Sequence, residues 1–330
     1  MPHAAITGIG AYLPEKVLTN HDLESMVDTS DEWIATRTGI RERHIAGEGE
    51  STSTLGAAAA RRALEDAGIG AADLDLIVVG TSSPDHIFPS TAALIQHAIG
   101  ASCPAVDVMA ACTSFVFALQ SAVSTIESGR ARRALVVGAD ALTRHVDFTD
   151  RATCVLFGDG AGAVVLEASE EAGVLGIDLG TDGSGSEVLM VRAGGSAAPC
   201  TPARLVAGEQ YVRMAGSEVF KFAVRVIPET TRRALEASGL SVEDVAWLVP
   251  HQANQRILLT VAERLGLPAS RVFSNIASVG NTSAASIPLA LNDLYTDGQL
   301  KPGDVVALVG FGAGLTWGAA IVRWTKGLPA

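Results

Sequence analysis

The sequence predicts an α/β fold built from two duplicated halves, each a mostly parallel sheet covered by helices. Residues 61–81 align without a gap with residues 232–252, and both segments begin with the string RRALE. Each segment reads as an amphipathic helix, a short acidic loop and an apolar strand, which is the alternation typical of parallel sheets. The chain has 330 residues, of which 48% are hydrophobic and 34 are glycine, so it can bury a large core.

Two further pairs of strings extend the repeat. Residues 111–114 (ACTS) align with residues 280–283 (GNTS), and residues 158–162 (GDGAG) resemble residues 310–314 (GFGAG). We therefore expect an N-terminal half over residues 1–170 and a C-terminal half over residues 171–330, related by a pseudo-twofold axis.

Charge and cysteine content limit the classes of function. The formal net charge of −12 argues against non-specific nucleic-acid binding, which needs a surplus of Lys and Arg. The cysteines show no paired spacing typical of a disulfide framework or a zinc site. We expect reduced thiols and a cytoplasmic protein; the four cysteines are Cys103, Cys112, Cys154 and Cys200.

The chain starts without the basic and apolar regions of a signal peptide. Residues 108–126 and 305–322 are uncharged and near the minimum length of a membrane span. The first stretch carries Ser, Thr and Gln along one side, and the second is interrupted by glycines. We expect both to be buried core, with no membrane insertion.

Cys112 lies where a strand is predicted to become a helix. Residues 105–109 read as an apolar strand, and apolar residues then recur with helical spacing from Phe115 to Ile126. A helix N-terminus favours a thiolate, so this position predicts a lowered pKa and a nucleophile that can carry an acyl group. The alternative, that Cys112 is a small buried hydrophobic residue, stays open from this segment alone.

His251 and Asn281 are the candidate partners of Cys112. His251 follows the apolar strand over residues 245–249, at the strand end where open α/β sheets gather their chemistry. Asn281 lies in a glycine-hinged helix start and, by the aligned strings, takes the place that Cys112 holds in the first half. The pseudo-twofold axis should bring the two together, with His251 joining them. Each residue alone would more often be structural, but together on symmetry-related strand and helix ends they point to one site.

With these residues in place, the chain resembles the thiolase superfamily over its whole length, and more closely the β-ketoacyl-acyl-carrier-protein synthase III family. The Cys-His-Asn set separates it from elongating synthases, which use two histidines, and from thiolases, which use a second cysteine. The resemblance implies a thiolase-like fold layered α-β-α-β-α. The matching strings are residues 31–34, 36–44, 157–162, 250–254, 280–283 and 310–318, together with the Cys112 turn.

The resemblance implies a decarboxylating Claisen condensation. Cys112 takes the acyl group of an acyl-CoA, and the backbone N–H groups of Cys112 and Ala313 form the oxyanion hole. Many relatives have glycine where this chain has Ala313, which would narrow the neighbouring pocket slightly. A malonyl-acyl carrier protein then loses carbon dioxide, and His251 and Asn281 donate hydrogen bonds to the enolate oxygen. No metal or redox cofactor is expected.

The resemblance also assigns the binding of coenzyme A. Its adenine would stack between Trp33 and Arg151, with Arg37 near the phosphates, by π and cation–π contact. Asn254 would orient a water molecule near His251. Without the resemblance, Trp33 would be taken as a surface aromatic residue.

Two partners follow from the same resemblance. Phe88 matches a residue that reaches across a homodimer and closes the partner's acyl pocket. A local basic patch could bind the acidic carrier protein, although Glu263 lies within it and a solvated mixed-charge face is the alternative. The patch would consist of Lys221, Arg225, Arg256 and Arg264.

Other functions stay open at this point. A starter-unit ketosynthase or acyltransferase of secondary metabolism could have the same three residues. A non-catalytic acyl-CoA-binding subunit would be expected to have lost its nucleophile, whereas Cys112 is present. The preferred acyl-CoA starter is not determined by the sequence.

Overall fold

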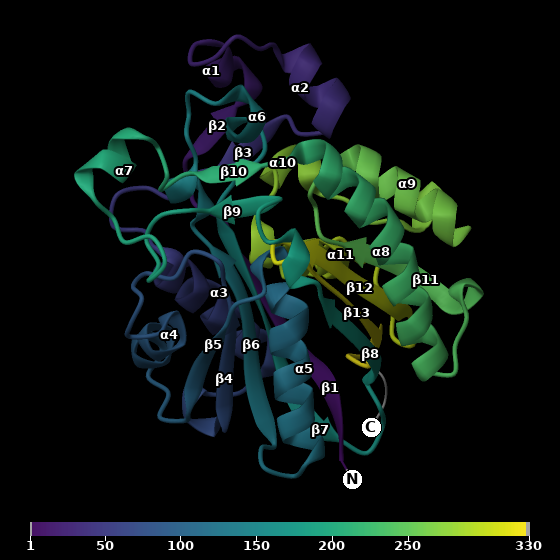
Figure 1. Cartoon of the computed structure of the whole chain (residues 1–330). Helices are drawn as coiled ribbons and strands as arrows, with labels where there is room; N and C mark the ends of the chain where they lie inside the picture. The colour runs from purple at the N-terminus through teal and green to yellow at the C-terminus, as the bar shows by residue number, and fades with distance from the viewer. Residues whose placement is uncertain (1, 328–330) are drawn as a thin grey trace.

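Two large sheets form the centre of the molecule in the computed structural model, which describes residues 2–327. The first sheet contains five strands and the second contains four (Figure 1). In spatial order the first consists of β1 (His3–Tyr12), β7 (Gly160–Ser169), β6 (Arg133–Asp140), β4 (Leu76–Gly80) and β5 (Ala105–Val108). The second consists of β8 (Val174–Thr181), β13 (Thr316–Arg323), β12 (Val305–Gly312) and β11 (Val245–Pro250).

The two sheets share one topology. In the first, β7 runs antiparallel to β1 and β6, whereas β4 is parallel to both β6 and β5. In the second, β13 runs antiparallel to β8 and β12, and β11 is parallel to β12. A parallel bridge between Leu248 and Val272 lies where the first sheet has its fifth strand. The duplication predicted from the RRALE segments is therefore present in the strand order.

The helices complete the five layers. α3 (Thr52–Ala67) packs on β1 and β7, and α8 (Gly216–Ala237) packs on β13 and β8, so each covers an outer face. α5 (Ser114–Glu127) and α11 (Ser286–Thr296) contact strands of both sheets and form the central layer. The predicted α-β-α-β-α fold is confirmed (Figure 1). Two more outer helices are α4 (Thr91–Ile99) and α9 (Gln255–Leu265).

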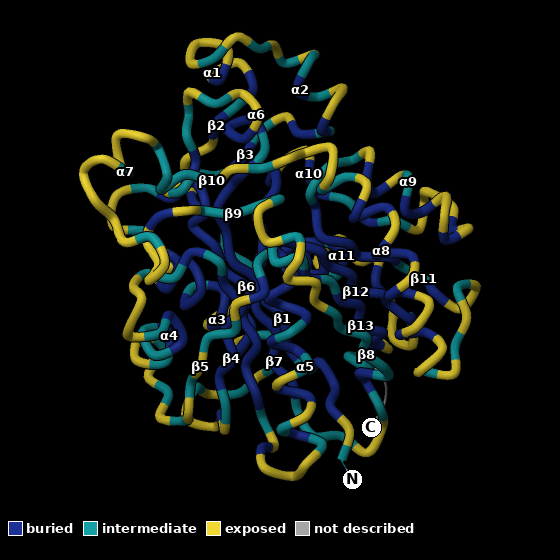
Figure 2. The backbone as a smooth tube through the Cα atoms, in the orientation of Figure 1, coloured by how far each residue is buried: buried dark blue, intermediate teal, exposed yellow. Residues whose placement is uncertain are grey.

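Burial follows this layering. The central strands are buried along most of their length, while exposed residues concentrate in the connecting segments (Figure 2). Strands covered by helices on both faces need apolar residues throughout, and β12 is buried at every position. This explains why residues 305–322 resemble a membrane span in composition. Within residues 2–327, no helix is long and apolar enough to cross a membrane.

A smaller cap lies at the upper end of the molecule in Figure 1 and holds several of the candidate binding residues. It is assembled from short elements, four of which form two small sheets: β2 pairs with β3, and β9 pairs with β10. These elements are β2 (Val17–Thr19), α1 (Asn20–Glu24), α2 (Asp31–Thr38), β3 (Glu42–His44), α6 (Arg151–Cys154), β9 (Leu189–Val191), α7 (Pro202–Val206), β10 (Val212–Met214) and α10 (Ile276–Val279).

The structure corrects two of the string alignments. Ala111 and Ser283 both have positive φ (50° and 51°), and each opens a 3-10 turn that leads into a central helix. The counterpart of Cys112 is therefore Ala284, and the alignment with Asn281 was wrong by three residues. The GDGAG match was also wrong, because residues 310–312 end β12, the counterpart of β6, whereas residues 160–162 begin β7. Glycine-rich strings recur wherever backbones approach closely, so they align without being equivalent.

Candidate active site

Cys112 lies in the turn between β5 and α5. The turn is held by Ser114, whose hydroxyl accepts the Ala110 N–H at 2.8 Å and donates to the Ala111 carbonyl at 2.6 Å. This arrangement places Cys112 at the start of the central helix, as predicted. The cysteine is 7% exposed and lines two cavities.

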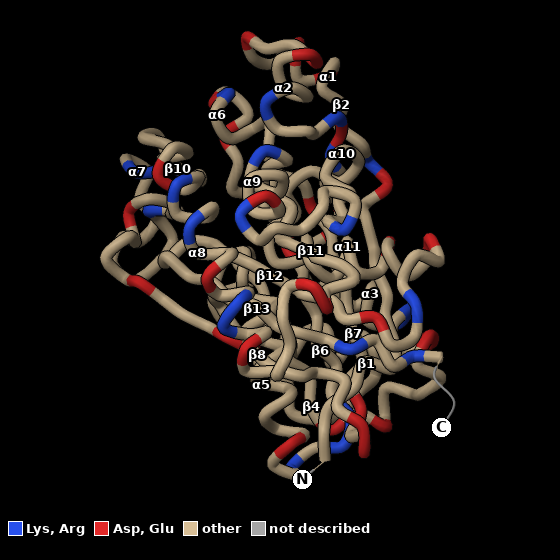
Figure 3. The backbone as a smooth tube through the Cα atoms, turned by 90° about the vertical axis from the view of Figure 1, so that its right-hand side faces the viewer, with Lys and Arg blue, Asp and Glu red and all other residues tan. Residues whose placement is uncertain are grey.

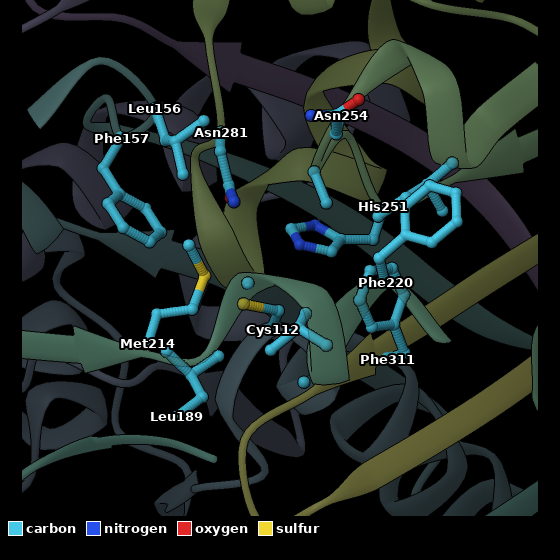
Figure 4. Close-up of a pocket in the computed structure, with 15 residues that line it drawn as sticks. Cys112, Leu156, Phe157, Leu189, Met214, Phe220, His251, Asn254, Asn281 and Phe311 are labelled. Atoms are coloured by element: carbon cyan, nitrogen blue, oxygen red, sulfur yellow. The ribbon is translucent and has the colours of Figure 1, made fainter. Parts of the chain in front are cut away.

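His251 and Asn281 reach the same space from the second half. The His251 N–H donates to the Val309 carbonyl at 2.7 Å directly beyond β11, and its ring packs edge-on against Phe311. The Asn281 Oδ1 accepts the Ser283 N–H at 3.0 Å, which leaves the amide nitrogen directed into the cavity. Figure 4 shows the Cys112 sulfur, the His251 ring and the Asn281 amide pointing toward one another.

The first cavity, of about 130 Å³, brings the three predicted residues together. Its walls are mainly apolar, and sequence reasoning missed them because β9, β10 and the start of α8 contain no recognisable motif. They include Leu156, Phe157, Leu189, Met214, Phe220 and Phe311. Phe157 and Phe311 alone had a signal, since they lie inside the matching strings over residues 157–162 and 310–318.

The second cavity, of about 260 Å³, opens on the other side of Cys112. Ala313 is one of its lining residues, and its walls are mostly apolar. The cavity therefore suits a hydrocarbon chain attached to the Cys112 sulfur. Its apolar walls include Leu142, Phe157, Leu189, Met190, Val191 and Val212.

Burial sets the ionisation of the two reactive groups. It is the main reason that the pKa of Cys112 is raised to about 12; the charge of Asp140 also raises the pKa, and the Ser283 hydroxyl, 3.4 Å from the sulfur, lowers it. The predicted lowering of the Cys112 pKa was therefore wrong for this site, because desolvation of the thiolate outweighs the helix N-terminus. Burial also lowers the pKa of His251 to about 3. At neutral pH the site holds a thiol beside a neutral imidazole.

The backbone beside Cys112 leaves room for an oxyanion. A Cβ atom built on Gly312 would lie 2.7 Å from the Cys112 nitrogen, so only glycine leaves that N–H accessible. The Thr316 hydroxyl lies 2.8 Å from the Ala110 carbonyl and 3.0 Å from the Ala313 carbonyl. It thereby fixes Ala313 relative to the turn that contains Cys112.

The three predicted coenzyme A residues meet in the cap. The guanidinium groups of Arg37 and Arg151 stand over the Trp33 ring, 5.2 Å and 4.9 Å from its centroid. Arg151 also donates to the Asp28 carbonyl at 2.7 Å. An aromatic plane with two guanidinium cations is suited to a nucleotide.

Asn254 joins this cap to the cavity. Its Nδ2 donates to the Arg37 carbonyl at 3.2 Å, and its Oδ1 accepts the Arg256 N–H at 2.9 Å as the N-cap of α9. Asn254 therefore holds α2 against α9 and lines the wall beside His251. The predicted contact with a water molecule stays a prediction.

The remaining candidates lie outside both cavities. Phe88 is 83% exposed, as is its neighbour Ile87. Lys221 on α8 pairs with Glu218 at 2.9 Å, and the Arg256 guanidinium stands over Phe220, 6.0 Å from the ring centroid. Acidic and basic residues are interspersed along α8 and α9 (Figure 3), so this surface is locally mixed rather than uniformly basic.

Comparisons with known proteins agree on one family. Profiles for 3-oxoacyl-[acyl-carrier-protein] synthase III match residues 106–183, and profiles for its C-terminal part match residues 235–324. A β-ketoacyl-[acyl-carrier-protein] synthase III of Roseiflexus castenholzii is 53% identical over 326 residues, covering 98% of this chain and 99% of that protein.

Solved structures give the same result. The 3-oxoacyl-(acyl carrier protein) synthase III of Pseudomonas aeruginosa superposes with a TM-score of 0.91 at 45% identity, covering 99% of this chain and 100% of the other. The priming β-ketosynthase of the R1128 polyketide pathway has a TM-score of 0.92 at 36% identity, with coverage of 98% and 97%.

Proposed function

The chain belongs to the β-ketoacyl-acyl-carrier-protein synthase III family, and on that premise we propose that Cys112, His251 and Asn281 perform its reaction. The protein is an acyltransferase-class condensing enzyme that initiates fatty-acid synthesis. The observation that supports the assignment of residues is their convergence on one buried cavity. Relatives at about 50% identity do not favour the alternatives of secondary metabolism or a silent subunit.

In the first half-reaction, the Cys112 sulfur attacks the thioester carbonyl of an acyl-CoA. The new S–C bond forms as the bond to coenzyme A breaks, and the cysteine proton leaves with the coenzyme A thiol. The N–H groups of Cys112 and Ala313 stabilise the oxyanion, in the space that Gly312 leaves open. The acyl chain occupies the cavity of about 260 Å³.

In the second half-reaction, a malonyl-acyl carrier protein enters the cavity of about 130 Å³ and loses carbon dioxide. The neutral His251 donates from Nε2 and Asn281 from its amide nitrogen, so the enolate oxygen receives two hydrogen bonds. The enolate carbon attacks the acyl-Cys112 carbonyl, the C–S bond breaks, and the Cys112 thiolate leaves and takes one proton from solvent. The low pKa of His251 keeps the ring neutral, and in the tautomer protonated on Nε2 the neutral ring still has the N–H that this role requires.

Coenzyme A would bind in the cap, with its adenine on Trp33. We expect Trp33→Ala to raise the KM for acyl-CoA by about tenfold, since a stacked cation and aromatic ring contribute on the order of 1–2 kcal/mol. The kcat should change little, because Trp33 lies away from the reacting atoms. Steady-state kinetics at varied acyl-CoA, with Trp247→Phe as a control outside the cap, would show this. A fall in kcat with unchanged KM would contradict the assignment.

Exposed surfaces support two proposed protein partners, a second copy of the chain and the carrier protein. A homodimer is supported by β5, an edge strand with exposed Val106, and by exposed Met109 directly after it. Ile87 and Phe88 are exposed in the loop before α4, the helix that packs on β5. The carrier protein would dock beside Lys221 and Arg256, whose stacking on Phe220 places it at the cavity wall. We further propose a cytoplasmic location; all four cysteines are free.

Acylation of Cys112 is the experiment that tests this proposal. The protein is incubated with acyl-CoAs from acetyl to medium and branched chains, and the mass of the peptide containing Cys112 is measured by mass spectrometry. We expect one acyl group on that peptide, and the most reactive starter identifies the fit of the apolar cavity. Labelling of Cys103, Cys154 or Cys200 instead would overturn the assignment of the nucleophile.

A further inference from the structure

The duplication gives the oxyanion site a counterpart in the first half. Asp140 ends β6 as Gly312 ends β12, and each forms the final pair with the following antiparallel strand. Ala284 is the counterpart of Cys112, and Ala141 is the counterpart of Ala313. The second site should therefore also have two converging backbone N–H groups.

Side chains fill this counterpart site. The Asp140 Oδ2 accepts the Ala284 N–H at 2.9 Å, and the Ser83 hydroxyl accepts the Ala141 N–H at 2.9 Å. At the corresponding place in the active half, Gly312 has no side chain and the cavity borders Cys112. One site binds a carboxylate supplied by the chain, and the other is left open for the oxyanion of the substrate.

The other carboxylate oxygen of Asp140 secures the loop after β4. Its Oδ1 accepts hydrogen bonds from the Thr81 hydroxyl (3.0 Å), the Ser82 N–H (2.7 Å), the Ser83 N–H (2.9 Å) and the Ser83 hydroxyl (2.7 Å). All of these neighbours donate, as a carboxylate requires. Asp140 is fully buried, so each of these bonds contributes more than it would at the surface.

The contact with Ala284 acts on the catalytic groups through Ser283. The Ser283 N–H holds the Asn281 Oδ1 at 3.0 Å, and the Ser283 hydroxyl lies 3.4 Å from the Cys112 sulfur. Ser283 also has φ of 51°, a conformation that a non-glycine residue keeps only when its surroundings hold it. Asp140 fixes the next residue and so supplies that constraint.

We propose that Asp140 is a positioning residue for both half-reactions: its carboxylate occupies the counterpart of the oxyanion site and holds Ser283 and Asn281 in their working geometry. This inference rests on the proposed roles of Cys112 and Asn281. The charge of Asp140 also raises the pKa of Cys112. The ionisable groups near the sulfur are Asp140 behind the turn and His251 across the cavity, and Asp159 lies close to Asp140.

The test compares Asp140→Asn with Asp159→Asn in the full-length enzyme. Both changes neutralise a buried acid in the same half, but Asp159 bonds Ala46 and Thr143 and does not act on Cys112. For Asp140→Asn we expect acylation and malonyl decarboxylation to fall about tenfold or more, the cost of misplacing donors. The pH at which alkylation of Cys112 by iodoacetamide becomes fast should be lower than in the wild-type enzyme, because removing a negative charge lowers the pKa of the thiol. Asp159→Asn should show neither change.

Several outcomes would overturn the inference. These are wild-type rates and an unchanged alkylation profile for Asp140→Asn, or the same shifts for Asp159→Asn. If Asp140→Asn does not fold, Ser83→Ala is the second test variant, since it removes one donor to the Asp140 carboxylate. It should lower the rates of acylation and of malonyl decarboxylation by a few-fold. Iodoacetamide needs no acyl substrate, so its result is independent of whether wild-type Cys112 accepts an acyl-CoA, which tests the proposed function itself.

Discussion

Replacing Cys112 with alanine should abolish transfer of the acyl group while malonyl decarboxylation continues. We expect condensation to fall by about 10⁴-fold or more, as is usual when a covalent nucleophile is removed. His251 and Asn281 remain in place, so the enolate can still form. Release of labelled carbon dioxide from malonyl-acyl carrier protein, measured beside β-ketoacyl product, separates the two steps.

The matched control is Cys154→Ala, which removes a second buried thiol that lies outside both cavities. It should retain both steps, apart from any loss of stability. Condensation at the wild-type rate by Cys112→Ala would show that the acyl group is carried elsewhere.

His251→Ala and Asn281→Ala should show the opposite pattern. Each removes one donor to the enolate oxygen, which typically costs about 10²–10³-fold in the rate. Acylation of Cys112 should persist, because its oxyanion is stabilised by backbone groups. Single-turnover mass measurements of the acyl-enzyme, followed by addition of malonyl-acyl carrier protein, resolve the two rates in one experiment.

Asn254→Ala is the control for this pair, since it lines the same cavity but uses its side chain to join α2 and α9. It should weaken acyl-CoA binding more than decarboxylation. If Asn281→Ala condenses at the wild-type rate, the assignment of Asn281 to the enolate is wrong.

The fold could be predicted because its repeat appears in the sequence as a long alignment without gaps. The RRALE segments preserve helix, loop and strand in register, and the strand order of the two sheets reproduces that duplication. The equivalent turns before the two central helices could not be aligned from the sequence, because Ala111 and Ser283 share a backbone conformation and not a residue type. Short glycine-rich strings therefore gave the wrong register for Asn281.

The site could be predicted only as far as its chemical groups. Cys112, His251 and Asn281 have signals in their positions at strand ends and helix starts. Most residues of the cavity walls have none, since Leu189 and Met214 come from short strands that only the fold brings close.

Ionisation could not be predicted from position along the chain. The helix start at Cys112 favours a thiolate, but the pKa depends on how deeply the sulfur is buried and on the charge of Asp140. Both depend on contacts between residues far apart in the sequence. The same holds for the Asp140 contact with Ala284, which joins the two halves.

The most direct test of the central claim is a single turnover of the acylated enzyme. Wild-type protein is acylated with its best acyl-CoA, separated from excess substrate and mixed with malonyl-acyl carrier protein. The masses of the Cys112 peptide and of the carrier protein are then measured by mass spectrometry. We predict that the acyl group leaves Cys112 as one β-ketoacyl-carrier and one carbon dioxide appear. Acyl-Cys112 that persists, or an acyl group that reaches the carrier without loss of carbon dioxide, would contradict the account.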